Sequence, residues 1–154
     1  MAITLEDIKK LLQARILVLD GAMGTMIQSL GFSEADFRGK LLKDHPHDLK
    51  GNNDLLSITQ PEAIKDIHRK YFNSGADICE TNTFNATAIS LADYKTEQLA
   101  YDINSASAKI AKEVAEEFNS KNFEVPKLVA GVLGPTNKTL SLSPNVNDPG
   151  FRAV

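Results

Sequence analysis

Three clusters of polar residues in this sequence carry the groups that bind small zwitterionic ligands. Each cluster follows directly on an apolar run: DGAMGT at residues 20–25, ETNTF at 80–84 and GPTN at 134–137. A carboxylate pairs with an ammonium group, and backbone N–H groups around a glycine bind a carboxylate. Together the clusters predict a site for a small ligand that carries both charges.

In the first cluster, the predicted contacts are Asp20, Gly21 and Ala22. The backbone N–H groups around Gly21 and Ala22 would cradle the carboxylate of an amino acid, and Asp20 would help to orient its α-amino end. The alternative is a strand-ending turn, in which the glycine adopts a positive φ and the aspartate caps the next helix. The cluster is not a phosphate loop, because it has neither GxGxxG spacing nor a following GK[ST].

In the second cluster, Glu80 is the acid most expected to contact the ligand. A carboxylate at a strand end needs a partner, and a substrate ammonium is a natural one; the alternative is a salt bridge to another strand. Thr81, Asn82 and Thr83 add hydroxyl and amide groups that can bond a zwitterion or order water, and one or two of them are expected to turn back into the packing. In the third cluster, Asn137 is predicted either to contact the ligand or to shape its loop.

The elements that must position these clusters are strands and helices in alternation. The apolar runs at residues 16–19, 76–79 and 128–133 are short and show little polar alternation, which is typical of parallel strands buried on both faces. Amphipathic helices are expected at 61–75 and 96–118, and a first helix at 5–13 is expected to cap an end. The fold class is therefore α/β with parallel strand–helix repeats, and ligands bind outside the carboxyl ends of such strands.

Length limits this fold. A (β/α)8 barrel needs about 250 residues, whereas this chain has 154, enough for about three strand–helix units. Residues 143–154 form a stretch rich in Pro, Asn and Asp, with no closing helix before the last residue, Val154. We therefore expect residues 1–154 to be the first part of a TIM barrel that is incomplete in this chain.

Composition argues against several functional classes. Seventeen basic and twenty acidic residues give a net charge of −3 without a basic block, so a nucleic-acid partner has no electrostatic support. No apolar run approaches membrane-spanning length, and the first twenty residues carry charges throughout, so we expect a cytoplasmic protein with no membrane partner. The polar stretch at residues 32–53 is long for a connection, and long loops at this end of a sheet tend to be functional.

Four side chains that could suggest a metal site or a reactive group are assigned other roles. Cys79 lies inside a buried strand with no second cysteine, and buried cysteine usually behaves as a small apolar residue. His45 and His47 are separated by a proline that directs their rings apart, and no third ligand is suitably spaced. His68 lies on the apolar side of its helix and is expected to be a core histidine with its hydrogen bonds satisfied.

Five segments in series resemble the homocysteine-binding region of the cobalamin-dependent methionine synthases. They are ILVLDGAMGTM (16–26), GNNDLLSITQP (51–61), GADICETNTFN (75–85), VAGVLGPTN (129–137) and SPNVNDP (143–149). Related homocysteine methyltransferases that use betaine or S-methylmethionine share the strand-DG opening and the helix before GAD. They generally lack the GNNDLL segment and the ETNTF and GVLGPTN forms, so the resemblance favours the cobalamin-dependent branch.

The resemblance implies a (β/α)8 barrel in which zinc, held by three cysteine thiolates, binds the sulfur of homocysteine. Zinc would deprotonate the thiol, whose ordinary pKa is near 8.5, at neutral pH. The thiolate would take a methyl group from methylcobalamin, which a separate domain remethylates from methyltetrahydrofolate.

In the family the zinc ligands come from late barrel strands, as one cysteine and then a CC pair, and none of these is present here, since the single cysteine, Cys79, belongs to an early strand. The resemblance therefore implies that these ligands lie beyond Val154, in later strands of the barrel. We expect the 154 residues to hold part of the homocysteine site, to contain no catalytic residue, to bind neither zinc nor cobalamin, and to be inactive alone.

Two other functions stay open at this point. One is a cobalamin-independent homocysteine methyltransferase, which would have no folate-binding domain after the barrel. The other is a non-catalytic α/β module that binds a small zwitterion or a nucleotide, and that predicts a compact monomer. The partial barrel predicts exposed sheet edges and self-association instead.

Overall fold

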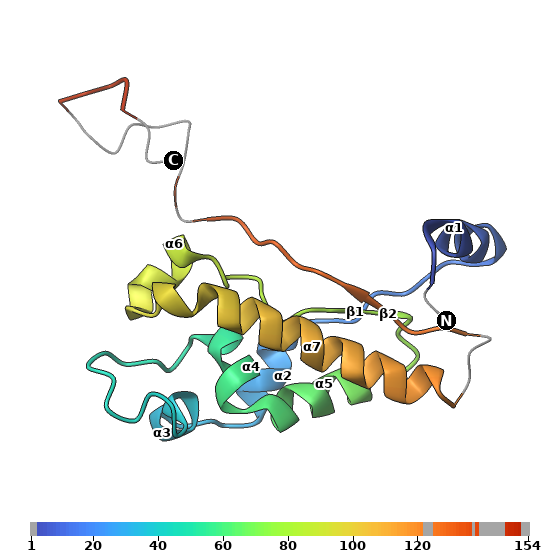
Figure 1. Cartoon of the computed structure of the whole chain (residues 1–154), viewed down its shortest axis with the longest axis horizontal. Helices are drawn as coiled ribbons and strands as arrows, with labels where there is room; N and C mark the ends of the chain where they lie inside the picture. Colours follow the sequence, from blue (N-terminus) through green and yellow to red (C-terminus); the bar gives the residue numbers. More distant parts are fainter. Residues whose placement is uncertain (1–2, 122–124, 137, 139–146, 152–154) are drawn as a thin grey trace.

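The computed structural model describes residues 3–121, 125–136, 138 and 147–151. Within them lie the α-helices α1 (Leu5–Ala14), α2 (Met23–Ser29), α3 (Glu34–Arg38), α4 (Leu56–Thr59), α5 (Pro61–Asn73), α6 (Ala88–Leu91) and α7 (Ala100–Asn119). The 3-10 helices are η1 (Asn53–Leu55), η2 (Ala92–Tyr94) and η3 (Glu97–Leu99), and the strands are β1 (Ile78–Glu80) and β2 (Leu128–Ala130). Figure 1 shows α4, α5 and α7 together on one side of the two strands.

The sheet is parallel, and its order follows the chain. β1 pairs with β2 in parallel, with Cys79 opposite Val129. On the other side of β1, the first apolar run contributes a single parallel bridge between Leu19 and Ile78. The Asp20 N–H extends that pairing by donating to the Ile78 carbonyl at 2.8 Å. These contacts confirm an α/β fold with parallel pairing, although each strand is shorter than its apolar run.

The helix boundaries follow local capping chemistry. Thr4 and Asp7 form a capping box at the start of α1, since each side chain bonds the other residue's backbone N–H. Pro61 occupies the first turn of α5, and Gly75, with a φ of 104°, follows its end. The predicted helix at 96–118 begins instead at Ala100, because residues 97–99 form the tighter turn η3.

Two apolar clusters form the core between the helices and the sheet. The larger one joins α2, α3, α4, α5 and α7, and includes the fully buried Leu55, Leu56, Ile64 and Ile103. The second joins α5 and α7 to β1, where Cys79 packs with Phe72 and Val114. Both clusters lie on the helical side of the sheet.

A buried ion cluster ties the beginnings of the three parallel segments together. Asp77 accepts two hydrogen bonds from the Arg15 guanidinium, at 2.7 and 2.8 Å, and one from the Val18 N–H at 2.9 Å. The Lys127 Nζ lies 3.9 Å from the same carboxylate and donates to the Ala76 carbonyl at 2.6 Å. The hydrogen bonds from Arg15 are the main reason that the pKa of the Asp77 carboxyl lies below its ordinary value.

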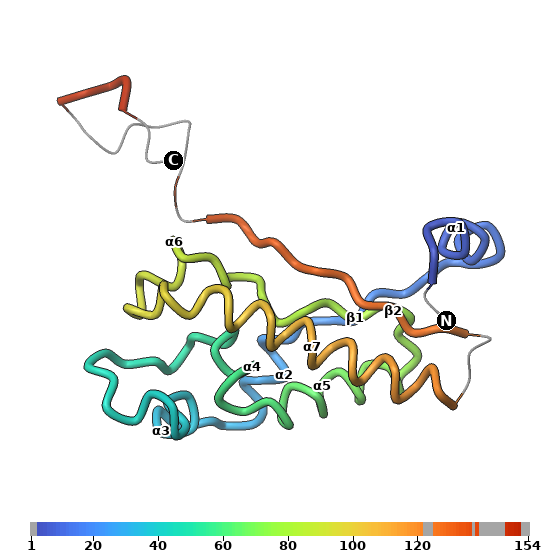
Figure 2. The backbone as a smooth tube through the Cα atoms, viewed as in Figure 1, coloured from blue at the N-terminus to red at the C-terminus, as the bar shows by residue number. Residues whose placement is uncertain are grey.

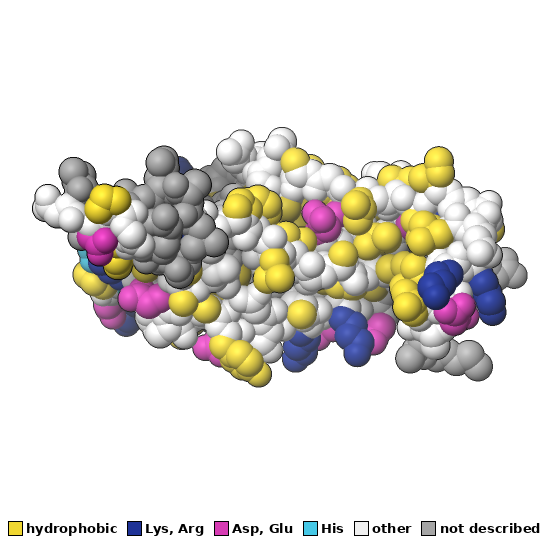
Figure 3. Space-filling model, turned by 90° about the horizontal axis from the view of Figure 1, so that it is seen from above, with side chains coloured by type: hydrophobic (Ala, Val, Ile, Leu, Met, Phe, Trp, Pro, Cys, Tyr) yellow, Lys and Arg dark blue, Asp and Glu magenta, His cyan; other side chains and the backbone are white. Residues whose placement is uncertain are grey.

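The prediction that the strands are buried on both faces is wrong for the described residues. Val18, Leu19 and Val129 are all exposed. Leu19 pairs with Ile78, on the face opposite the buried Cys79, whereas Val129 pairs with Cys79 itself and is exposed in β2, the outer strand of the described pair. Figure 3 looks down on the molecule and shows hydrophobic side chains gathered toward the end where α1 lies. α1 itself buries none of its residues, and Figure 2 shows it standing apart from the helical layer. It therefore does not cap the described part of the sheet.

The long stretch at residues 32–53 is folded by its own charged residues. The Glu34 carboxylate pairs with Arg38 at 2.7 Å and accepts the backbone N–H groups of Leu49 and Lys50. The Arg38 guanidinium donates to the carbonyls of His45 and His47. Of the described helices, none is both long enough and apolar enough to cross a lipid bilayer.

Candidate functional site

A cavity of about 430 Å³ lies where the first parallel segment and β1 end. Its walls come from residues 20–24, residues 80–84 and Val132, which follows β2. The lining includes seven of the eight residues predicted to form a site, namely Asp20, Gly21, Ala22, Glu80, Thr81, Asn82 and Thr83. The eighth, Asn137, lies outside the described residues. The parallel strands thus bring two of the three predicted clusters to one cavity at their carboxyl ends.

Asp20 and Glu80 give this cavity two carboxyl groups. The Glu80 backbone N–H donates to both carboxylate oxygens of Asp20, at 3.1 and 3.2 Å. Burial raises the pKa of the Asp20 carboxyl to about 6, and the charge of Glu80 adds to the rise while the Glu80 N–H opposes it. The Glu80 side chain is exposed and forms no ion pair with the part of the chain that the structure describes. A cation, and an ammonium group in particular, would satisfy both acids.

Thr81 and Thr83 use their hydroxyl protons inside the protein. The Thr83 hydroxyl donates to the Val132 carbonyl at 2.9 Å, so the 2.7 Å contact between the two hydroxyls has Thr81 as donor. The Thr81 oxygen in turn accepts the Val132 N–H at 3.0 Å. Each hydroxyl therefore retains only acceptor capacity for a ligand, which suits an ammonium group and not a carboxylate.

The side-chain amide nitrogen of Asn82 donates its hydrogen bonds to groups of the protein. That nitrogen donates to the Asn53 carbonyl at 2.8 Å and to the Ser57 hydroxyl at 3.2 Å. Both of its hydrogens are thus used to hold the GNND segment against the strand end. As predicted, part of the second cluster turns back into the packing, and here Asn82 joins two motifs that are distant in sequence.

Gly21 and Ala22 connect Asp20 to α2. A Cβ atom on Gly21 would lie 3.1 Å from the ring and the hydroxyl of Tyr71, so glycine allows Tyr71 to approach closely. Ala22 occupies the N-cap position of α2, and no side chain caps the helix there. That these backbone groups bind a ligand carboxylate stays a prediction.

Four further residues line the cavity and were not predicted as site residues: Met23, Gly24, Phe84 and Val132. Met23, Gly24 and Phe84 belong to the two clusters that the sequence singled out, but their side chains offer no polar group. Val132 lies in the apolar run before the third cluster. These four residues have no polar side-chain group, which is why a prediction built on polar clusters did not include them.

A known protein family matches nearly the whole chain. The model of the family described as homocysteine S-methyltransferase covers residues 17–153. The chain belongs to this family. Crystal structures of the homocysteine methyltransferase MmuM from Escherichia coli are similar to it, at 25% identity and a TM-score of 0.63 for the metallated form and 26% and 0.62 for the oxidized form. Each match covers 83% of this chain, which spans only 41% and 40% of the length of those two chains.

The zinc site that the resemblance implies does not fit the described residues of this chain. Cys79 is its only cysteine, is 0% exposed, and packs in the second apolar cluster. Burial raises the pKa of its thiol to about 12, and the charge of Asp20 adds to the rise, whereas a zinc ligand must be a thiolate. No group of three His, Cys, Asp and Glu side chains in the described ranges could hold a metal ion. The described residues offer groups for holding an amino acid and no metal ligand set.

The family's cysteine ligands are predicted to come from later barrel strands. The prediction places them beyond Val154, and Val154 itself lies outside the described residues, which end at Phe151. That the ligands come from later barrel strands therefore stays a prediction. What the described residues do establish is that Cys79 does not replace them.

The histidines of this family member lie away from the cavity lining. The His45 and His47 rings are 6.1 Å apart, and His45 Nε2 bonds the Tyr94 carbonyl at 2.8 Å. His68 is buried as predicted, but the expectation that its hydrogen bonds are satisfied is wrong. Neither ring nitrogen has a hydrogen-bond partner in the described structure. Burial lowers the pKa of His68 to about 4, so the ring is neutral at pH 7.

Proposed function

We propose that the cavity holds the amino-acid end of homocysteine and that the protein acts in methyl transfer to the homocysteine sulfur. The observation that carries this proposal is a pair of carboxyl groups, Asp20 and Glu80, in one cavity at the carboxyl ends of parallel strands. Membership of the homocysteine S-methyltransferase family supports the choice of substrate.

In this proposal the ammonium group of the substrate binds Asp20 and Glu80. With a pKa of about 6, Asp20 is about nine-tenths ionised at pH 7 and more so once a cation is bound. The remaining acceptor lone pairs of Thr81 and Thr83 would complete the ammonium's hydrogen bonds. The backbone N–H groups around Gly21 would take the substrate carboxylate, which leaves the thiol end free to point toward the methyl donor.

We propose further that the donor is methylcobalamin, as in the cobalamin-dependent methionine synthases. The support is the series of five sequence segments, above all GNNDLL and ETNTF. The zinc ligands and the cobalamin and folate sites would then come from polypeptide beyond Val154. A longer gene product with one cysteine at a strand end, a later CC pair and a following folate-binding domain would agree with this; a cobalamin-independent enzyme would lack that domain.

We also propose that residues 1–154 are the N-terminal portion of the homocysteine-binding barrel and that the protein is cytoplasmic. The sequential parallel strand order, the open apolar face of the sheet and the 41% coverage of MmuM support a partial barrel. The unpaired sheet edges would favour self-association. Sedimentation of this chain tests the idea, because a compact monomer at high concentration favours the non-catalytic binding module.

Titration of the isotope-labelled chain with L-homocysteine under reducing conditions, followed by NMR, tests the substrate assignment. Asp20→Asn and Glu80→Gln should each weaken binding roughly 10-fold or more, because each removes a charge-assisted hydrogen bond to the ammonium. Asp93→Asn, an exposed acid on η2, serves as the control and should leave the affinity unchanged. In the longer gene product both cavity variants should retain wild-type zinc content. Loss of zinc with either change would refute the assigned roles.

A further inference from the structure

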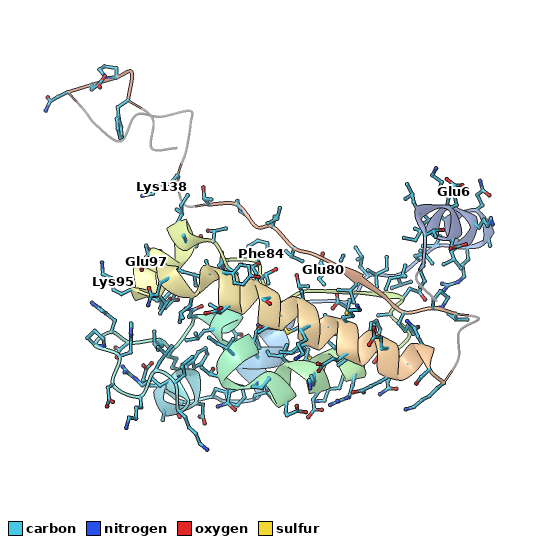
Figure 4. All side chains as sticks on the ribbon, in the orientation of Figure 1. Glu6, Glu80, Phe84, Lys95, Glu97 and Lys138 are labelled. Atoms are coloured by element: carbon cyan, nitrogen blue, oxygen red, sulfur yellow. The ribbon has the colours of Figure 1, made fainter. Side chains whose placement is uncertain are left out.

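Phe84 is an aromatic side chain that lines the cavity and is nevertheless 55% exposed. It stands four residues after Glu80, so the segment 80–84 carries a carboxylate at one end and an aromatic ring at the other. Figure 4 labels both residues, with Glu80 at the end of β1 and Phe84 further along, toward α6. Isolated exposed apolar residues are common on protein surfaces, so exposure alone assigns no role to this ring.

The backbone of Phe84 is fixed from two sides, and this sets it apart from an ordinary exposed residue. Its carbonyl accepts the Gly134 N–H at 3.1 Å. The two segments approach so closely that a Cβ atom on Gly134 would clash with the Phe84 carbonyl oxygen. On the other side, the Asp54 carboxylate accepts the N–H of Asn85 at 3.3 Å and also bonds the N–H of Phe84.

Asp54 fixes this segment at a cost in stability. It is only 3% exposed, and no cation pairs with it in the described structure. Removing a carboxylate from water without a cation is unfavourable unless hydrogen bonds replace the lost hydration. The bonds available here are the N–H groups at the end of the cavity segment. The GNNDLL motif, which holds Asn82 through the Asn53 carbonyl, thus also holds the backbone that carries Phe84.

We propose that Phe84 is the specificity-determining wall of the cavity, positioned by Asp54 and Gly134. Its ring packs against the unbranched apolar side chain of an amino acid whose ammonium group is held by Asp20 and Glu80. This inference rests on the proposed function, since it assigns the apolar half of the same cavity. The ligand class is an L-amino acid with a linear side chain of about three to four heavy atoms, and branched or shorter side chains leave the ring uncovered.

The expected selectivity follows from burial of methylene groups. One fully buried methylene strengthens binding about fourfold. L-norleucine has a side chain two methylenes longer than that of L-2-aminobutyrate, and Phe84 covers such a chain on one side only. Together these give a preference for L-norleucine of about fourfold. Neither probe contains sulfur, so a missing metal does not affect the comparison.

NMR titration of the full chain with both amino acids tests the proposal. The wild-type chain should prefer L-norleucine about fourfold, Phe84→Ala should remove that preference, and Phe84→Leu should retain most of it. Leu133→Ala is the matched control, because Leu133 is also an exposed apolar residue near the cavity but does not line it. The control should bind both probes as the wild-type chain does.

Two results overturn different parts of the reasoning. If the wild-type chain prefers L-norleucine and Phe84→Ala keeps that preference, Phe84 is not the wall, while the amino-acid cavity stands. If the wild-type chain binds neither amino acid, the proposed substrate site and this inference both fail. Truncation of an exposed ring leaves no core void, so Phe84→Ala is expected to fold normally.

The positioning role of Asp54 has its own readout. Asp54→Ala should speed hydrogen exchange at the Phe84 and Asn85 amides and remove the L-norleucine preference, while L-2-aminobutyrate binding persists. Asp54→Asn keeps an oxygen acceptor and should restore both properties. Unchanged selectivity in a folded Asp54→Ala chain excludes the positioning role. If Asp54→Ala does not fold, the amide exchange rates of Asp54→Asn test the positioning role, and the Phe84→Ala and Phe84→Leu variants test the wall.

Discussion

Amino-acid binding by this chain should weaken as the pH falls through the pKa of Asp20. Burial raises that pKa to about 6, so the carboxyl is about nine-tenths ionised at pH 7 and about one-tenth ionised at pH 5. A neutral carboxylic acid does not attract an ammonium group. The apparent dissociation constant for an amino acid should therefore rise about tenfold between pH 7 and pH 5.

The assay is NMR titration with L-norleucine at pH 5, 6 and 7, because this ligand has no thiol and its amino group stays protonated throughout. Asp20→Asn provides the comparison, since it removes the titrating group and keeps the shape. Its affinity should be low at every pH and should change little across the range. The titration should also give a midpoint near pH 6 in the wild-type chain.

Tyr71 and Cys79, two other titratable groups that interact with Asp20, would not produce this pH dependence of binding. Tyr71 has a pKa raised above its ordinary value, first by burial and then by the Asp20 charge, and the Cys79 thiol is raised to about 12, so neither ionises below pH 7. Glu80 is exposed and is the remaining acid in the cavity lining. If Asp20→Asn keeps the tenfold dependence, the titrating group is not Asp20 and the cavity electrostatics are wrong.

The remaining predictions concern stability and ligand charge. The folded pKa of His68, about 4, lies below its ordinary 6.5, so the unfolded chain takes up the proton first as pH falls. Between pH 7 and pH 4 the free energy of unfolding should drop by about 3 kcal/mol from this group, and His68→Leu should abolish that part of the slope in urea titrations. Asp77→Ala should cost about 3 kcal/mol in urea unfolding, because it leaves Arg15 and Lys127 without their buried partner, whereas exposed Asp66→Ala should cost less than about 1 kcal/mol. Gly134→Ala should speed exchange of the residue-134 amide, which Gly131→Ala should not do, because a Cβ on Gly131 meets no atom within 4 Å. n-Pentylamine, which is L-norleucine without its carboxylate, should bind more tightly than hexanoate, and equal binding in the same NMR assay would contradict the excess of acceptors in the cavity.

The sequence predicted the parts of this structure that depend on local chemistry. The helices predicted at 5–13 and 61–75 are α1 and α5, and the groups that bound them, the Thr4–Asp7 capping box and the proline at the start of α5, act within a few residues. Parallel pairing followed from apolar runs separated by helices, and this brought residues 20–22 and 80–83 to one cavity. Each of these inferences needs only the spacing of residue types along the chain.

The sequence could not predict features that depend on contacts between distant segments. Asp77 lies in an apolar run, and nothing near it indicates that Arg15, sixty-two residues earlier, neutralises it. The donor groups of Asn82 are consumed by Asn53 and Ser57, which local patterning does not link to it. Burial of both strand faces was inferred from apolar runs with little polar alternation, yet burial depends on which elements cover each face.

The hydrogen-bond donors and acceptors that remain available in the cavity favour a cation over an anion. The hydroxyl protons of Thr81 and Thr83 and both amide protons of Asn82 are donated to protein acceptors. The side chains that remain available, including Asp20 and Glu80, can only accept while both acids are ionised. A ligand carboxylate can therefore be met only by backbone N–H groups at the start of α2, whereas an ammonium group meets an excess of acceptors. In the proposed binding mode the amino group therefore fixes the ligand, and the side chain would run along segment 80–84 toward Phe84.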